Sequence, residues 1–144
     1  MLSNFKVILV ETSHPGNIGA VARAMKNMGM DQLRLVNPKF FPHADATARA
    51  SGADNVLKNA AVYSSLTDAL ADCQIILGAS ARDRTISWPS VTARECAEKW
   101  LTADYANTNI ALVFGRENSG LKNHELDLCH FLLRLPCNPE YSSL

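Results

Sequence analysis

The chain has 144 residues, of which 47% are hydrophobic and 19% charged, a composition typical of one compact soluble domain rather than a disordered chain. Fourteen basic residues balance fourteen acidic ones, which argues against a protein that holds nucleic acid by net charge alone but not against a local basic patch. No segment has the length of a membrane span and the first residues lack the layout of a signal peptide, so we expect a cytoplasmic protein with no membrane partner.

The first part of the chain predicts a strand, a helix and a second strand. Residues 5–10 (FKVILV) and 32–36 (QLRLV) are short apolar runs typical of buried strands. Between them, apolar residues recur with helical period from Ile18 to Met28. We expect Asn17 to cap this helix at its N-terminus and Gly29 to end it.

The opposite side of this helix carries Gly19, Arg23 and Lys26. A solvated helix face is the simple interpretation of the two cations. Gly19, however, costs a helix roughly 1 kcal/mol relative to alanine, so we expect something to pack or bind closely on this side.

The middle of the chain predicts short elements and then a loop that could hold a ligand. We expect a short helix over 44–53 that carries Arg49, a strand over 60–63, a helix that ends at Leu70, and a buried strand over 73–79. The strand opens into a loop of small and basic residues. Small residues would let a flat ligand approach the backbone, and two cations there could meet phosphate, namely Arg82 and Arg84.

The last part predicts a helix over 92–101, a buried strand over 110–114, a short helix from Asn123 to Cys129 and a last strand over 130–135. Between Gly115 and Gly120 the chain presents four polar residues, directly after a buried strand. Open α/β folds place ligand chemistry at such positions, although an ordinary tight turn between a strand and a helix is the alternative.

Strands and helices alternate along the whole chain, which predicts an α/β fold with a mostly parallel sheet of about six strands flanked by helices, in a single domain over residues 1–144. The loops after Ala79, Phe114 and Leu135 all follow strands, so we expect them to gather at one edge of the sheet. The four cysteines, Cys73, Cys96, Cys129 and Cys137, lack metal-ligand spacing, and we expect reduced core residues and no metal.

Common nucleotide and hydrolase motifs are absent from the sequence. After Gly120 comes Leu121-Lys122, so the lysine and hydroxyl of a phosphate-binding P-loop are misplaced. The first turn between a strand and a helix lacks the dinucleotide-binding Gly-x-Gly-x-x-Gly pattern, and the chain has no Gly-x-Ser-x-Gly elbow.

Three segments, in order, resemble the signature motifs of the SPOUT class of RNA 2′-O-ribose methyltransferases. They are residues 15–25 (PGNIGAVARAM), 112–121 (LVFGRENSGL) and 138–144 (NPEYSSL). With residues 10–14 and 80–82 included, the chain is most similar to the bacterial members that methylate cytidine or uridine at position 32 in the tRNA anticodon loop.

This resemblance implies a trefoil-knotted α/β fold, an exception to the rule that chains do not thread loops, and also a homodimer, tRNA as substrate and S-adenosylmethionine as methyl donor. The helix that completes the knot, and a further region that helps to bind tRNA, would follow Leu144. The residues that would hold the methyl donor are Ala79, Ser80, Ala81, Gly115, Leu135, Ser142, Ser143 and Leu144.

Within the same resemblance, Arg23, Asn17 and Glu117 match catalytic-motif positions, and the RNA-binding candidates are Arg23, Lys26, Arg82, Arg84 and Arg116. A guanidinium keeps its proton beyond pH 12, so we interpret Arg23 as an electrostatic anchor for phosphate and a developing alkoxide rather than as a base. Glu117 is expected to face a neighbouring helix terminus or a partner subunit, as an organiser rather than an acid catalyst.

Two alternatives to the enzyme stay open at this point. One is a non-catalytic RNA-binding module on the same scaffold, and the other is a plain nucleotide-binding α/β protein. The joint presence of Arg23, Asn17 and Glu117 favours the enzyme, and the missing glycine motifs disfavour the nucleotide-binding protein.

Overall fold

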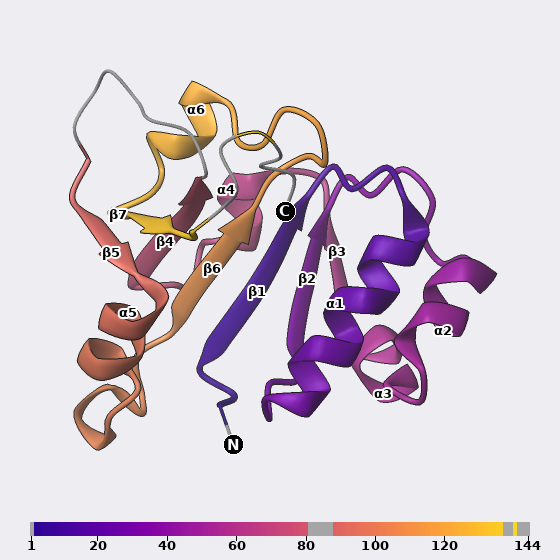
Figure 1. The fold of residues 1–144 in the computed structure, drawn as a ribbon, viewed down its shortest axis with the longest axis horizontal. Helices are drawn as coiled ribbons and strands as arrows, with labels where there is room; N and C mark the ends of the chain where they lie inside the picture. The colour runs from indigo at the N-terminus through magenta and orange to yellow at the C-terminus, as the bar shows by residue number, and fades with distance from the viewer. Residues whose placement is uncertain (1, 81–87, 137–139, 141–144) are drawn as a thin grey trace.

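The computed structural model describes residues 2–80, 88–136 and 140. Strands and helices alternate along the chain as the sequence predicts (Figure 1). In chain order the elements are β1 (Phe5–Val10), α1 (Pro15–Asn27), β2 (Gln32–Val36), α2 (Ala44–Ala50), α3 (Asp54–Lys58), β3 (Ala61–Tyr63), α4 (Leu66–Ala69), β4 (Ile75–Ser80), β5 (Ser90–Thr92), α5 (Ala93–Trp100), a 3₁₀ turn (Ala103–Tyr105), β6 (Ile110–Phe114), α6 (Asn123–Leu126) and β7 (Phe131–Arg134).

The described strands form one seven-stranded sheet in the order β3-β2-β1-β6-β4-β7-β5. Every neighbouring pair is parallel, which confirms the predicted α/β class. In the centre of the sheet, Val7 of β1 is level with Leu33 of β2 on one side and with Leu112 of β6 on the other. The sheet has one strand more than predicted, because β5 is only three residues long and buries a single side chain, that of Val91.

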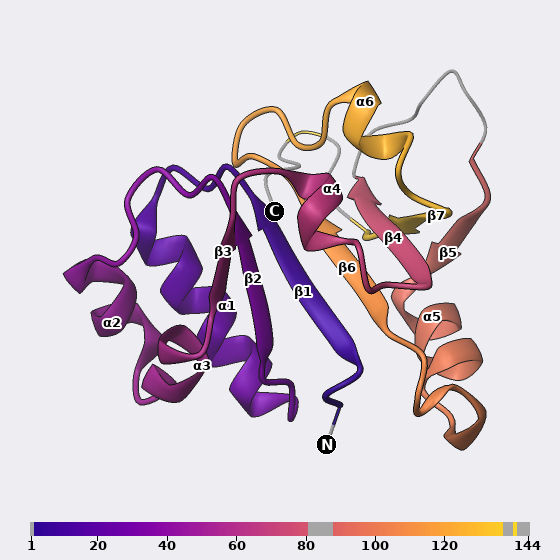
Figure 2. The ribbon, with the colours of Figure 1, turned by 180° about the vertical axis from the view of Figure 1, so that it is seen from behind.

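Helices cover both faces of the sheet, as Figures 1 and 2 show from opposite sides. Alternate residues of β1 point to opposite faces. Val7 and Leu9 pack with α1, whose outer side is covered by α2 and α3, and Phe5 packs on the same face with α5. Ile8 and Val10 pack on the other face with α4 and α6.

The boundaries of three helices differ from the prediction. α1 begins at Pro15 with His14 at the N-cap, so Asn17 is not the cap; proline suits the first helical position because its missing N–H needs no partner there. The helix expected over 44–53 ends at Ala50 as α2, because Ser51 and Gly52 adopt left-handed conformations with φ of 50° and 92°; a separate helix that was not predicted, α3, follows over Asp54–Lys58. α6 has Lys122 rather than Asn123 as its N-cap, and it ends at Leu126 rather than at Cys129.

Gly19 explains how closely α1 and α2 approach each other. The residue is buried, and a Cβ placed on it would overlap the carbonyl oxygen of Ala46 in α2. The expected close packing on this side of the helix is therefore confirmed. Further along α1, Lys26 Nζ donates to the carbonyl oxygen of Gly52 at 3.1 Å and to Asn55 Oδ1 at 3.2 Å.

The described cysteines agree with the prediction of free thiols. Cys96 and Cys129 are buried in the core and Cys73 is half-buried, while Cys137 lies outside the described residues. Burial raises the pKa of the Cys129 thiol to about 12. Of the helices that the structure describes, none combines the length and apolarity needed to cross a membrane.

Candidate functional site

The three loops expected at one edge of the sheet do start side by side. β4 pairs with β6 through Gly78 and Val113, and with β7 through Ser80 and Arg134, so the carboxyl ends of these strands are adjacent. Ala79 and Ser80 are buried at the end of β4, Gly115 follows β6 directly and Leu135 follows β7 directly. Six predicted site residues lie outside the described part of the chain. Four are candidates for holding the methyl donor and two are candidate RNA contacts: Ala81, Ser142, Ser143 and Leu144, and Arg82 and Arg84.

The loop after β6 closes on itself. Arg116 N donates to the Gly120 carbonyl at 3.1 Å, and Gly120 N donates back to the Arg116 carbonyl at 2.9 Å. A Cβ on Gly115 would overlap the backbone of Gly120 and Leu121. The loop itself therefore requires glycine at position 115.

The Arg116 side chain connects this loop to α6 and to the segment after β1. Its guanidinium binds both oxygens of Glu125 in α6, at 2.8 Å and 2.9 Å, and Glu11 Oε2 after β1 at 2.6 Å. The Arg116 side chain is only 15% exposed and that of Glu125 only 5%. The Arg116 donors therefore meet carboxylates inside the protein and support the loop, while the expected contact of Arg116 with RNA stays a prediction.

Electrostatics within this cluster favour the ionised form of the buried carboxylate. Burial alone would raise the pKa of Glu125, but hydrogen bonds from Arg116 and from the backbone N–H of Lys122, the latter at 2.6 Å, outweigh it and lower the pKa below its ordinary value. The cluster thus holds a charged, bidentate ion pair beneath the loop.

Glu117 points at the N-terminus of α1, which is one of the two placements expected for it. Its carboxylate accepts from Ser13 N at 3.1 Å and 3.2 Å, from His14 N at 2.9 Å and from Asn17 Nδ2 at 3.1 Å. Burial would raise the pKa of Glu117, but the backbone donors of His14 and Ser13 outweigh it and lower the pKa to about 2. The helix dipole favours a negative charge at this position as well.

The structure brings Asn17 and Glu117 together but leaves Arg23 apart from them. Arg23 lies six positions after Asn17, about 9 Å further along the helix axis. It is on the exposed side of α1, opposite the buried Ile18 and Met25. Arg23 makes no hydrogen bond or ion pair with any residue that the structure describes. The three catalytic-motif residues are therefore not assembled within one copy of the chain.

Two features near the start of α1 were not predicted as part of a site. The side chain of Arg49 in α2 crosses over Gly16, with its guanidinium carbon 3.8 Å and Nη1 3.4 Å from the position that a Cβ on Gly16 would take. In addition, Lys39 N, after β2, donates to the Thr12 carbonyl at 3.1 Å. The sequence predicts that Arg49 lies on a short helix. Its contact with Gly16 could not be predicted, because it depends on how α1 and α2 pack against each other.

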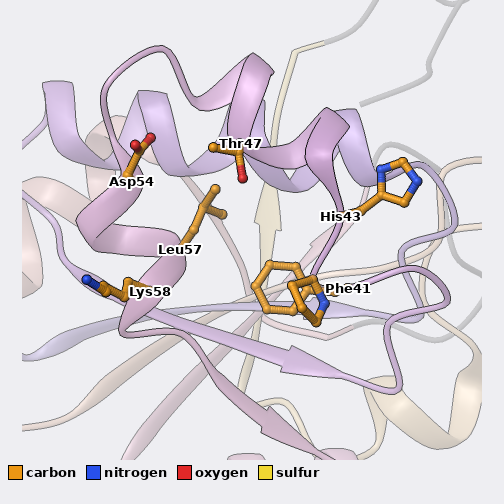
Figure 3. A pocket seen from close by; sticks show the side chains of 7 residues that line it. Phe41, His43, Thr47, Asp54, Leu57 and Lys58 are labelled. Carbon is orange, nitrogen blue, oxygen red and sulfur yellow. The ribbon is translucent and has the colours of Figure 1, made fainter.

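A separate hollow lies on the outer side of α2 and α3. It has a volume of about 340 Å³ and runs from His43 at one end to Asp54 and Lys58 at the other, with Phe41 and Leu57 between them (Figure 3). None of the predicted site residues lines it. Across residues 2–80, 88–136 and 140, no group of three or more histidine, cysteine, aspartate or glutamate side chains is arranged to hold a metal ion.

Comparisons with known proteins show which proteins the chain is similar to. A family model described as the SpoU rRNA Methylase family matches residues 4–144. The chain is 56% identical over 144 residues to the tRNA (cytidine/uridine/adenosine-2′-O-)-methyltransferase TrmJ of Pseudomonas aeruginosa, covering 100% of this chain and 56% of that protein.

Two solved structures show the same fold. A protein described as a probable methylase family protein, from Haemophilus influenzae, has a TM-score of 0.91 and 48% identity, over 100% of this chain and 60% of that one. The SpoU methyltransferase AviRb of Streptomyces viridochromogenes, in complex with AdoMet, has a TM-score of 0.71 and 18% identity, over 99% of this chain and 55% of that one. The chain thus spans a little over half the length of the curated relative it matches.

Proposed function

The chain belongs to the SpoU rRNA methylase family, and on that basis we propose that it is the catalytic part of a methyltransferase that modifies the ribose 2′-hydroxyl of a tRNA nucleotide. The proposed target is cytidine or uridine at position 32 of the anticodon loop. The name of the Pseudomonas relative supports the tRNA ribose as acceptor and adds adenosine as a third base. The observation that carries the proposal is the contact of Glu117 with the helix that bears Arg23, because it joins two of the three signature motifs.

S-adenosylmethionine is the proposed methyl donor. The adjacent ends of β6, β4 and β7 suit such a molecule, because the small residues Ala79 and Ser80 at the end of β4 carry no long side chain that would keep an adenosine from the backbone. When bound, the donor supplies an electrophilic methyl group on a sulfonium. The residues proposed to hold it are those that the motifs indicate: Ala79, Ser80, Ala81, Gly115, Leu135, Ser142, Ser143 and Leu144.

Arg23 is the proposed catalytic residue. Its guanidinium stays protonated throughout the physiological range, so it is suited to bind the phosphate beside the target ribose and to stabilise the oxyanion that develops there. Glu117 and Asn17 act as positioning residues, since they hydrogen-bond to each other at the start of the helix that carries Arg23. Lys26, Arg82, Arg84 and Arg116 are the remaining proposed RNA contacts.

We further propose that the active protein is a homodimer in the cytoplasm. The outward direction of Arg23 supports this assembly, because an arginine on the exposed side of α1 is placed to complete a site in a second copy. A mixing experiment tests it. Arg23→Ala and Leu135→Trp chains, each inactive alone, are expected to regain activity when co-refolded, whereas a monomer or a site within one chain would leave the mixture inactive.

Two variants at one position test the catalytic role. Arg23→Ala is expected to abolish tRNA methylation while calorimetry shows unchanged binding of S-adenosylhomocysteine, because the residue holds RNA rather than the donor. Arg23→Lys is expected to restore little, since an ammonium lacks the planar fork of donors. Substantial activity of Arg23→Lys would contradict this part of the proposal.

The non-catalytic RNA-binding module is the second candidate, and it predicts tRNA binding without binding of S-adenosylhomocysteine. Mass spectrometry of tRNA from a deletion strain identifies the target. Loss of a 2′-O-methyl group at position 32 supports the proposal, and an unchanged set of ribose methylations contradicts it.

A further inference from the structure

The loop between β2 and α2 exposes an aromatic ring at the sheet edge where the signature loops also begin. Phe40 is 50% exposed, although the next residue, Phe41, packs against the core under α1 and α2. A single exposed apolar side chain is common at a protein surface, so the meaning of the Phe40 ring depends on the groups around it.

The surroundings of Phe40 are cationic and polar. Lys39 Nζ lies 5.7 Å from the centre of the ring, and the His43 ring meets it edge-on at 6.4 Å. The backbone N–H of Asp45 donates to His43 Nδ1 at 3.0 Å, which assigns the histidine proton to Nε2, where it can be donated outward. The acid at this junction is Asp45, whose carboxylate is 3.8 Å from His43 Nδ1.

Three cations on this side have no ion pair within the described part of the chain: Arg23, Lys39 and Arg49. In contrast, Arg34 and Arg116 are each bound to carboxylates. Because the Arg49 side chain crosses Gly16 at the start of α1, its charge lies over the first signature motif. Of these cations Lys39 lies beside the exposed Phe40 ring, and an unpaired cation beside an exposed aromatic ring is a combination that binds single-stranded nucleic acid.

This surface is also continuous with the candidate site. Lys39 N donates to the Thr12 carbonyl, and the next residue, Ser13, donates to Glu117. β2 is separated from β6 by β1 alone, which places the loop about 10 Å from the Gly115 loop. Nucleotides of one RNA strand can reach both positions.

We propose that Lys39, Phe40 and Arg49 form a binding platform for single-stranded RNA, in which Phe40 stacks on a base next to the methylated nucleotide and the two cations hold its phosphates. The proposal rests on the proposed function for the identity of the RNA. It adds a contact surface on α2 and its preceding loop, outside all three signature motifs.

The test uses Phe40→Ala, Phe40→Trp and Arg49→Gln in the full-length protein, with tRNA binding measured by fluorescence anisotropy and methyl transfer measured separately. Phe40→Ala is expected to weaken tRNA binding and raise KM by roughly tenfold with little change in kcat, whereas Phe40→Trp keeps the affinity. Arg49→Gln is expected to lower the slope of log Kd against log salt by roughly one.

Matched controls come from the same molecule. Leu101→Ala removes an exposed apolar side chain that is 46% exposed at the end of α5, which lies at the opposite edge of the sheet (Figure 1). Lys58→Gln removes a cation of α3 at the far end of the hollow in Figure 3. Both variants are expected to bind tRNA with unchanged affinity and salt dependence.

The outcomes separate this inference from the proposed function. If the wild-type protein methylates tRNA and Phe40→Ala binds tRNA as the wild type does, the platform is wrong and the enzyme stands. If the wild type binds tRNA through Phe40 but transfers no methyl group, the platform stands and the proposed function fails. If Phe40→Ala instead changes the oligomeric state in light scattering with unaltered tRNA affinity, the ring is a protein contact and the platform is overturned.

Discussion

Glu117 connects the loop after β6 to the start of α1 through hydrogen bonds. Its carboxylate accepts hydrogen bonds from the backbone N–H of the N-cap residue His14, from that of Ser13 before it, and from the Asn17 amide. An ionised carboxylate accepts these hydrogen bonds better than an amide, because each of its oxygens can accept two hydrogen bonds. Its negative charge also interacts favourably with the positive end of the helix dipole.

Glu117→Gln is expected to lower the free energy of unfolding by about 1–3 kcal/mol. The NH₂ group of the new amide is a donor, and it would face the backbone N–H donors of Ser13 and His14. The same change should reduce kcat by freeing the start of α1. Urea unfolding and methyl transfer measure the two effects. Glu98→Gln, on the exposed side of α5, is the matched control. A Glu117→Gln protein as stable as this control would contradict the role assigned to the carboxylate.

At the level of elements, the close contact between α1 and α2 depends on glycine, which has no side chain, at position 19. Gly19→Ala is expected to destabilise the protein by about 1–3 kcal/mol, because the new Cβ overlaps the Ala46 backbone and must separate two helices, which outweighs the gain in helix propensity.

Gly16→Ala makes the same change three residues earlier on the same helix. There the new Cβ meets only the flexible Arg49 side chain, at 3.4 Å, so thermal unfolding should show a much smaller shift. Equal destabilisation by the two variants would mean that helix packing is not what requires Gly19.

The Arg116–Glu125 pair connects the loop after β6 to α6. Arg116→Met is expected to cost about 3–5 kcal/mol, since it leaves the buried Glu125 carboxylate without its cation. The double variant Arg116→Met with Glu125→Met should recover much of this loss, because no charge is then left buried. Chemical denaturation of both single variants and the double variant gives the coupling energy. Additive effects would show that the pair is not coupled.

Strands and helices can be predicted from the sequence where neighbouring residues determine them. Contacts between residues that are far apart in the chain cannot be predicted in this way. The buried runs that become β1, β2 and β6, and the exposed position of Arg23, follow from periodicity alone. The end of α2 at Ala50 has a local signal in Gly52, whereas the alanine-rich run favours a helix up to Ala53; α3, over Asp54–Lys58, was not predicted. The partners of Arg116 could not be predicted: Glu11 is 105 positions away, and Glu125 is buried only because α6 packs on the sheet.

For the molecule as a whole, depressed carboxyl pKa values predict how stability depends on pH. The hydrogen bond from Arg34 lowers the pKa of Asp72 to about 2, and the donors around Glu117 lower its pKa to about 2 as well. Both folded values lie below the ordinary values of 3.8 and 4.5 expected for the unfolded chain. The stability from these groups is therefore complete above about pH 5 and is lost as the pH falls toward 2.

We expect the free energy of unfolding, measured by urea titration, to stay constant between pH 7 and about pH 5 and to fall steadily below that. Glu117→Gln should show a shallower fall, because one of the contributing groups no longer titrates. A wild-type profile that is flat down to pH 3 would mean that these carboxylates are not depressed in the folded state.

The position of β6 in the sheet has a consequence for how the protein is made. β6 lies between β1 and β4, yet it is synthesised after both of them, with Phe5 of β1 paired to Ile110. At about 5–20 residues per second, the ribosome needs on the order of ten seconds to deliver β6 after β1 has emerged. During that interval an apolar strand edge is open to other chains, so the nascent protein is most vulnerable to aggregation before its central strand arrives.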